Sequence, residues 1–80
     1  MERNAIHDDL QEIFRTVFDD STLSITDNTT SSDIEDWDSL EQINLLSTIE
    51  REFKIKFTVG DVEGLANVGA MIDVIMKKLA

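Results

Sequence analysis

Apolar residues recur at helical spacing in three segments of the chain. In the first segment, from about Arg3 to Phe18, the apolar positions share one face of an α-helix: Ile6, Leu10, Ile13, Phe14, Val17 and Phe18. Three polar residues, Asp19-Asp20-Ser21, follow this pattern and end it. We therefore predict a first helix over this segment.

A second helix is predicted from Ser39 to about Phe53. Asp38 precedes the apolar pattern and Glu41 follows three residues later, which is the signature of a helix start with a capping box. The apolar positions expected on one packing face are Leu40, Ile43, Leu46, Ile49 and Phe53. The spacing of four between Glu50 and Lys54 favours an ion pair worth a few tenths of a kcal/mol, so packing must hold this helix.

The C-terminal third predicts one short and one long helix. Thr58 and Asp61 are spaced to cap a short helix that runs to Glu63, and Ile55 with Phe57 alternates with lysines in an extended connector before it. Asn67 is expected to cap the last helix, in which Asp73 and Lys77 are spaced to pair on the outer side. Its apolar face comprises Val68, Met71, Ile72, Ile75 and Leu79.

A polar stretch of about twenty residues separates the first two helices. Such a connection is long for a small domain and is normally either functional or a sign that the elements around it are misassigned. Four spaced apolar residues, Leu23, Ile25, Ile34 and Trp37, predict that this loop is pinned onto the helices. The expected fold is all-α: a four-helix bundle with three long helices, one short helix and this long loop, formed by residues 1–80 as a single domain.

Charge is distributed unevenly along the chain. The formal charge is −10, and residues 1–50 contain thirteen acidic but only two basic side chains, whereas residues 51–80 contain four acidic and five basic ones. An acidic surface repels nucleic acid and anionic lipid, and it steers the chain toward basic patches on partner proteins. The simpler interpretation is that the acidic side chains only make the protein soluble.

Cysteine is absent, so the chain itself has no disulfide and no thiol for chemistry or metal binding. No apolar stretch is long enough for a signal peptide or a membrane span. We therefore expect a cytoplasmic protein that binds neither nucleic acid nor membrane.

Ser39 is the strongest candidate for chemistry. It falls in the first turn of the second helix, beside backbone N–H groups that have no partner within the helix. The positive end of the helix favours a phosphate there, so a phosphoester on Ser39 is electrostatically favourable. Serine is also common at helix starts for capping alone.

The layout resembles that of an acyl carrier protein over essentially the whole chain. The resemblance rests on Asp38-Ser39-Leu40 at the head of the second of four helices, the long loop before it, the run over residues 45–53, the short segment at residues 58–63 and the final helix near Asn67. It implies that Ser39 carries 4′-phosphopantetheine, transferred from coenzyme A by a phosphopantetheinyl transferase. The thiol that the chain lacks would then arrive on this arm and hold acyl groups as thioesters, without catalysis by the carrier.

The resemblance also implies a docking surface. Asp38 is similar to the acidic residue beside the attachment serine, Leu40 to the apolar residue that meets partner enzymes, and Glu41 and Glu50 to acidic contacts for basic partner surfaces. The implied partners are the transferase and acyl-transferring or chain-elongating enzymes of fatty acid, polyketide or related lipid biosynthesis, which meet a monomeric carrier.

This sequence departs from strongly acidic carriers of fatty acid synthesis at several positions. Gln42 and Asn44 are neutral, and Arg51, Lys54 and Lys56 add positive charge. Partner choice is therefore expected to differ. The alternatives are a carrier for an amino acid or another specialised cargo, and, from a different class, an acidic interaction module that is never modified.

Two other chemistries fit the sequence less well. Ser39 with His7 and Asp8 has the residue types of a hydrolytic triad, but no nucleophile-elbow glycines surround the serine. Acidic residues at 27, 33, 35 and 38 are spaced as in a calcium loop, but Ser32 stands where that loop needs glycine.

Flexible features near the C-terminus suit an acyl cargo. Met71 and Met76 could flank an expandable cleft, although core filling is the better interpretation for Met71. Gly60, Gly64 and Gly69 lower the local stability around the short helix, so hydrogen exchange is predicted to be faster in residues 58–66 than in the long helices.

Overall fold

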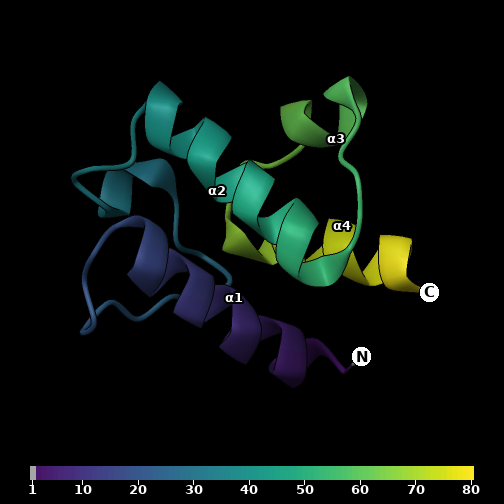
Figure 1. Cartoon of the computed structure of the whole chain (residues 1–80), viewed down its shortest axis with the longest axis horizontal. Coiled ribbons are helices and arrows are strands. Elements are labelled where there is room, and N and C mark those ends of the chain that lie inside the picture. Colours follow the sequence, from purple (N-terminus) through teal and green to yellow (C-terminus); the bar gives the residue numbers. More distant parts are fainter. Residues whose placement is uncertain (1) are drawn as a thin grey trace.

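The computed structural model describes residues 2–80, and four α-helices dominate them (Figure 1). These are α1 (Arg3–Val17), α2 (Ser39–Phe53), α3 (Val59–Glu63) and α4 (Val68–Leu79), with a single-turn 3₁₀ helix, η1 (Ser31–Asp33), in the long loop. The described residues contain no strand. The predicted all-α fold of three long helices and one short helix is confirmed.

The core lies where α1 packs against α2 and α4. Helix α1 crosses the lower part of Figure 1, and α2 runs above it in the opposite direction. Residues with no exposed surface come from all three helices: Ile6, Leu10, Phe14, Leu45, Ile49, Val68, Met71, Ile72 and Ile75. Met71 therefore fills the core, as the sequence suggested.

The long loop is fixed to the bundle at several points. Ile25 and Ile34 are buried and Leu23 and Trp37 pack against the core, which confirms that the loop is pinned. Its backbone also joins the start of α4: the Val68 N–H donates to the Thr29 carbonyl and the Gly69 N–H to the Asp27 carbonyl, both at 2.9 Å. Side-chain packing and backbone hydrogen bonds to α4 therefore both fix the loop before it enters α2.

The buried face of α2 differs from the prediction. Leu45, Ile49 and Phe53 are buried, whereas Leu40 is 65% and Ile43 63% exposed. The first turn of α2 presents these two apolar residues to solvent. The predicted packing face was therefore wrong at its N-terminal half and omitted Leu45.

The expected ion pairs along α2 and α4 are not those that form. Asp73 pairs with Arg3, whose guanidinium also contacts Asp27 at 2.9 Å, and so joins α1 to the loop and to α4. The Glu50 carboxylate accepts the Phe57 N–H at 2.8 Å, and Lys54 ends α2 in a left-handed conformation with φ 56°. Both predicted pairs were wrong because the carboxylates have other partners: a backbone N–H after α2 for Glu50 and Arg3 of α1 for Asp73.

Helix α3 is attached to the bundle more lightly than the other helices. None of its residues is buried, and Val59 is 77% exposed. The predicted cap is present, since Thr58 and Asp61 form a reciprocal capping box. Lys78 of α4 contacts Asp61 at 2.7 Å, and this ammonium together with the Thr58 N–H lowers the Asp61 pKa to about 2.

Both ends of the described chain lie on the same side of the molecule. In Figure 1 the N- and C-termini are at the right, whereas α2 begins at the upper left. The start of α2 is thus distant from both termini.

Candidate functional site

Ser39 is the first residue of α2, and it is exposed. Asp38 caps the helix, because its Oδ1 accepts the Glu41 N–H at 2.9 Å. The reciprocal half of the predicted capping box does not form: the Asp38 N–H donates to the Asp36 carbonyl at 3.0 Å instead. The helix start is therefore fixed by the cap and by the loop before it.

The electrostatics of this helix start suit an anion on Ser39. The first N–H groups of a helix have no intrahelical acceptor. Asp38 takes the Glu41 N–H, which leaves those of Ser39 and Leu40 without a partner among residues 2–80. They add to the positive end of a fifteen-residue helix, a favourable environment for a phosphate group.

A pocket of about 450 Å³ adjoins Ser39. It lies between the start of α2, η1 and the connection from α3 to α4, and its wall is formed by Ser31, Trp37, Asp38, Ser39, Gln42, Ile43, Leu65 and Ala66. Apolar side chains thus stand beside hydroxyl, carboxylate and amide groups. The sequence did not predict this pocket, because its walls come from three separate segments.

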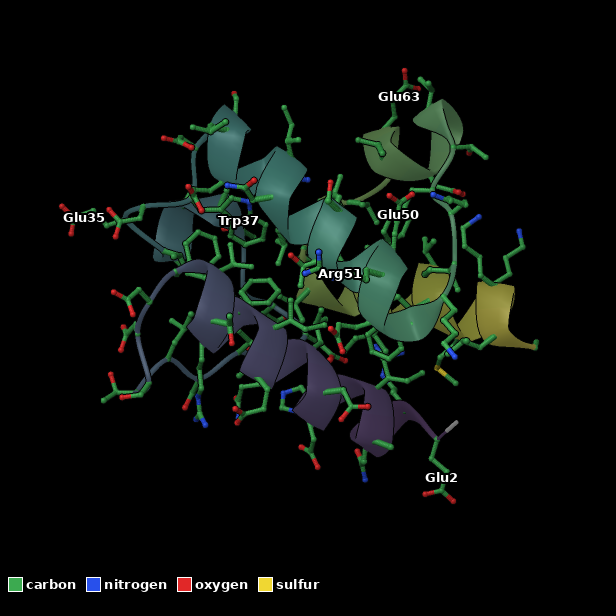
Figure 2. The ribbon with its side chains drawn as sticks, in the orientation of Figure 1. Glu2, Glu35, Trp37, Glu50, Arg51 and Glu63 are labelled. Carbon is green, nitrogen blue, oxygen red and sulfur yellow. The ribbon has the colours of Figure 1, made fainter. Side chains whose placement is uncertain are left out.

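Trp37 is held in this wall by two aromatic contacts and one hydrogen bond. Its ring meets that of Phe14 edge-on, with centroids 5.3 Å apart and an interplanar angle of 85°, and lies 5.9 Å from Phe18. Its indole Nε1–H donates to the side-chain oxygen of Gln42. Figure 2 shows Trp37 at the N-terminal part of α2, next to the end of α1.

Carboxylates from the end of α1, the loop and the first turn of α2 lie together near Ser39. A second hollow, of about 360 Å³, is bordered by five of them: Asp19, Glu35, Asp36, Asp38 and Glu41. Glu35 projects away from the body of the molecule in Figure 2, whereas Glu50 points toward the connection between α2 and α3. Of the two glutamates that the resemblance implied as docking contacts, only Glu41 borders this acidic surface.

The residues of the two competing chemistries have other roles in the structure, although His7 Nδ1 does lie 3.4 Å from Asp8 Oδ1. The His7 ring lies against the Ile25 carbonyl, with Nε2 at 2.7 Å, so it is occupied in tying α1 to the loop. Asp27 pairs with Arg3, and Asp33 accepts the Thr30 N–H at 2.8 Å as part of the η1 cap. No cluster of three potential metal ligands occurs in residues 2–80. The calcium-loop arrangement therefore does not form.

The chain matches the family model described as a phosphopantetheine attachment site over residues 8–75. The chain belongs to the acyl carrier protein family. Among solved structures, this carrier is similar to the solution structure of holo acyl carrier protein from Geobacter metallireducens, with 46% identity and a TM-score of 0.86 over 90% of this chain and 83% of that one. No curated protein sequence matches it.

Family membership confirms the predicted class of function. An acyl carrier protein presents its cargo to separate enzymes and is not itself a catalyst, and its cofactor is covalently attached phosphopantetheine. The alternative function, an acidic interaction module that is never modified, does not agree with this family, whose members carry phosphopantetheine. None of the helices in residues 2–80 is long and apolar enough to cross a membrane.

The residues around Ser39 fit this cofactor. An exposed hydroxyl is available for the phosphodiester, and unpartnered N–H groups lie beside it. The adjoining pocket combines apolar side chains with the amide of Gln42, and the pantetheine arm likewise carries both methyl and amide groups. When bound, the arm supplies the thiol that this chain lacks.

Proposed function

We propose that Ser39 is the attachment residue and that the carrier shuttles acyl groups, held as thioesters, between enzymes of fatty acid or related biosynthesis. The observation that carries this proposal is the exposed hydroxyl at the first position of α2, beside two unpartnered backbone N–H groups. Asp38 supports the role of Ser39 by fixing where the helix begins.

The test is modification by coenzyme A and a phosphopantetheinyl transferase, followed by intact mass. We expect the wild-type chain to gain one arm and Ser39→Ala to gain none. Ser47→Ala is the matched control, because Ser47 is an exposed serine of the same helix that does not border the pocket. Full modification of Ser39→Ala would refute the assignment.

The docking surface that we propose combines an acidic and an apolar part around Ser39. Asp38 and Glu41 belong to the carboxylates near Ser39, and Leu40 and Ile43 expose apolar surface on α2. Partner enzymes with basic rims and an apolar centre would match both parts. Glu50 is the least suited of the four residues assigned to docking, since its carboxylate already accepts the Phe57 N–H.

The dependence of the transfer rate on salt tests this surface. Association between opposite charges slows as salt rises. We expect Glu41→Gln to lower both the rate at low salt and its salt dependence, whereas Asp9→Asn, the same charge change on an exposed residue of α1, should have a smaller effect. Equal effects of the two substitutions would indicate that only net charge matters.

The cargo is proposed to be an acyl group, with an amino acid or another specialised unit as the alternative. Beyond its first turn, the exposed polar residues of α2 are Asn44, Ser47, Arg51 and Glu52. This set contains only one carboxylate, which favours partners other than those of a strongly acidic carrier. We also propose that the carrier acts as a monomer, which sedimentation of the apo and holo forms would test.

A further inference from the structure

In the pocket beside Ser39, a hydrogen bond from Trp37 to Gln42 determines which end of the Gln42 amide is free to bind a ligand. An indole N–H can only donate, so the Gln42 atom that it meets must be the amide oxygen. The orientation of the amide is thereby fixed, and the Gln42 NH₂ group is left without an acceptor among residues 2–80. Because Gln42 also lines the pocket, this NH₂ group is available to a ligand there.

The rest of the wall is suited to branched apolar groups. Ile43, which is 63% exposed, and Leu65 lie on the pocket with the ring of Trp37. The ring is held from behind by Phe14 and cannot move aside without losing that contact. The pocket therefore offers one oriented amide donor next to a rigid aromatic wall.

We propose that Gln42, oriented by Trp37, is a positioning residue that binds the arm on Ser39, accommodating its dimethyl group against Trp37 and donating to its first amide carbonyl. Ser39 and Gln42 are three residues apart on one helix, so their side chains are neighbours, roughly 5–6 Å apart at Cβ. The part of the arm within that reach is the segment next to the phosphate, which carries two methyl groups and an amide.

This inference rests on the proposed attachment at Ser39 and goes beyond it. An arm bound in this way rests on the protein when no partner is present, instead of moving freely in solvent. Its far end, with the thiol, remains available to partner enzymes.

The test is nuclear magnetic resonance of the holo protein beside the apo protein. Conversion to the holo form is expected to shift the Gln42 side-chain amide and Trp37 indole signals, and to give Overhauser contacts between the arm's methyl groups and the Trp37 ring. A chain that gains no arm would refute the attachment at Ser39. A chain that gains the arm but shows neither contacts nor shifts would refute only the bound arm.

Gln42→Glu separates the two hydrogen bonds of this side chain. A carboxylate still accepts the indole N–H, so the apo protein should keep its melting temperature, but it cannot donate to the arm. Loss of one hydrogen bond is expected to reduce the ratio of bound to free arm about fivefold, seen as weaker methyl–Trp37 contacts.

Asn44→Asp is the control for the added charge. It converts an amide to a carboxylate on the same helix, at an exposed residue outside the pocket. Wild-type contact intensity is expected in its holo form. If Gln42→Glu also kept wild-type contacts, or if Asn44→Asp weakened them as much, the donor role of Gln42 would be wrong.

Discussion

Replacing Gly69 by alanine should destabilise the carrier, although alanine is the better helix former. Gly69 lies in the first turn of α4 and is buried against the long loop. A Cβ at this position would lie 3.1 Å from both the Asp27 carbonyl oxygen and the Asp27 Cβ. The same carbonyl accepts the Gly69 N–H at 2.9 Å, so it cannot withdraw without weakening that bond.

The magnitude follows from two opposed effects. Alanine in place of glycine stabilises a helix interior by about 1 kcal/mol, and by less in a first turn. Forcing extra volume into a packed site costs typically about 1–3 kcal/mol, and here the site also holds the backbone bond between loop and helix. The net expectation is a loss of about 1 kcal/mol, or a melting temperature lower by roughly 4–8 °C for a domain of this size.

Gly60→Ala provides the matched comparison. A Cβ there would meet only the Thr58 Oγ1, at 3.8 Å, which is ordinary contact. Gly60 is likewise in a first turn, so this substitution in α3 should stabilise by about 0.5 kcal/mol. Thermal and urea unfolding of both variants would check the signs. If the Gly69→Ala and Gly60→Ala proteins had the same free energy of unfolding, the loop would be able to shift without a cost in stability, and the reasoning would be refuted.

Three further predictions concern the cap of α2 and the attachment of α3. Asp38→Ala should lower the free energy of unfolding by about 1 kcal/mol because the α2 cap is lost, whereas Asp38→Asn keeps an acceptor and should stay near wild type; chemical unfolding measures both, and an unchanged Asp38→Ala would contradict the cap. The contact between Asp61 and Lys78 should weaken in acid, because the Asp61 pKa is lowered from 3.8 to about 2 in the folded protein: its stabilisation is complete above the unfolded value and is lost as pH falls through about 2. Hydrogen exchange in residues 58–66 should be faster than in the long helices at neutral pH, and Lys78→Gln should accelerate it further; equal protection of all four helices would contradict this.

The elements of the fold could be predicted from sequence because their signals are local. Helix starts at Asp38, Thr58 and Asn67 depend on a side chain reaching an N–H two or three residues away, and all three caps form. The predicted end of α1, at about Phe18, was one residue too late, because the helix ends at Val17 and Phe18 is its C-cap.

The contacts between elements could not be predicted in the same way. Six apolar residues cover a wide arc of α2, and periodicity cannot tell which of them meet the other helices; the start of α2 extends beyond the core, which leaves Leu40 and Ile43 exposed. Likewise, the partner of Asp73 is Arg3, seventy residues away. Spacing along one helix carries no information about such a pair.

For the candidate site, the sequence located the serine and its cap but not its surroundings. Ser39 and Asp38 are neighbours in the chain, so a local motif sufficed. Leu65 and Ser31 reach the pocket only through the folded path of the loop and of the α3–α4 connection. The one available signal was Trp37, a large aromatic residue in an otherwise polar stretch immediately before the motif.

Because both termini lie on the side of the molecule away from the start of α2 (Figure 1), the carrier can be anchored by either end without covering Ser39, the proposed attachment residue. A tag, a surface tether or a fused enzyme placed at residue 2 or residue 80 would leave the acidic loop and the first turn of α2 facing outward. Immobilised carriers of this design should accept arms and release cargo as the free protein does.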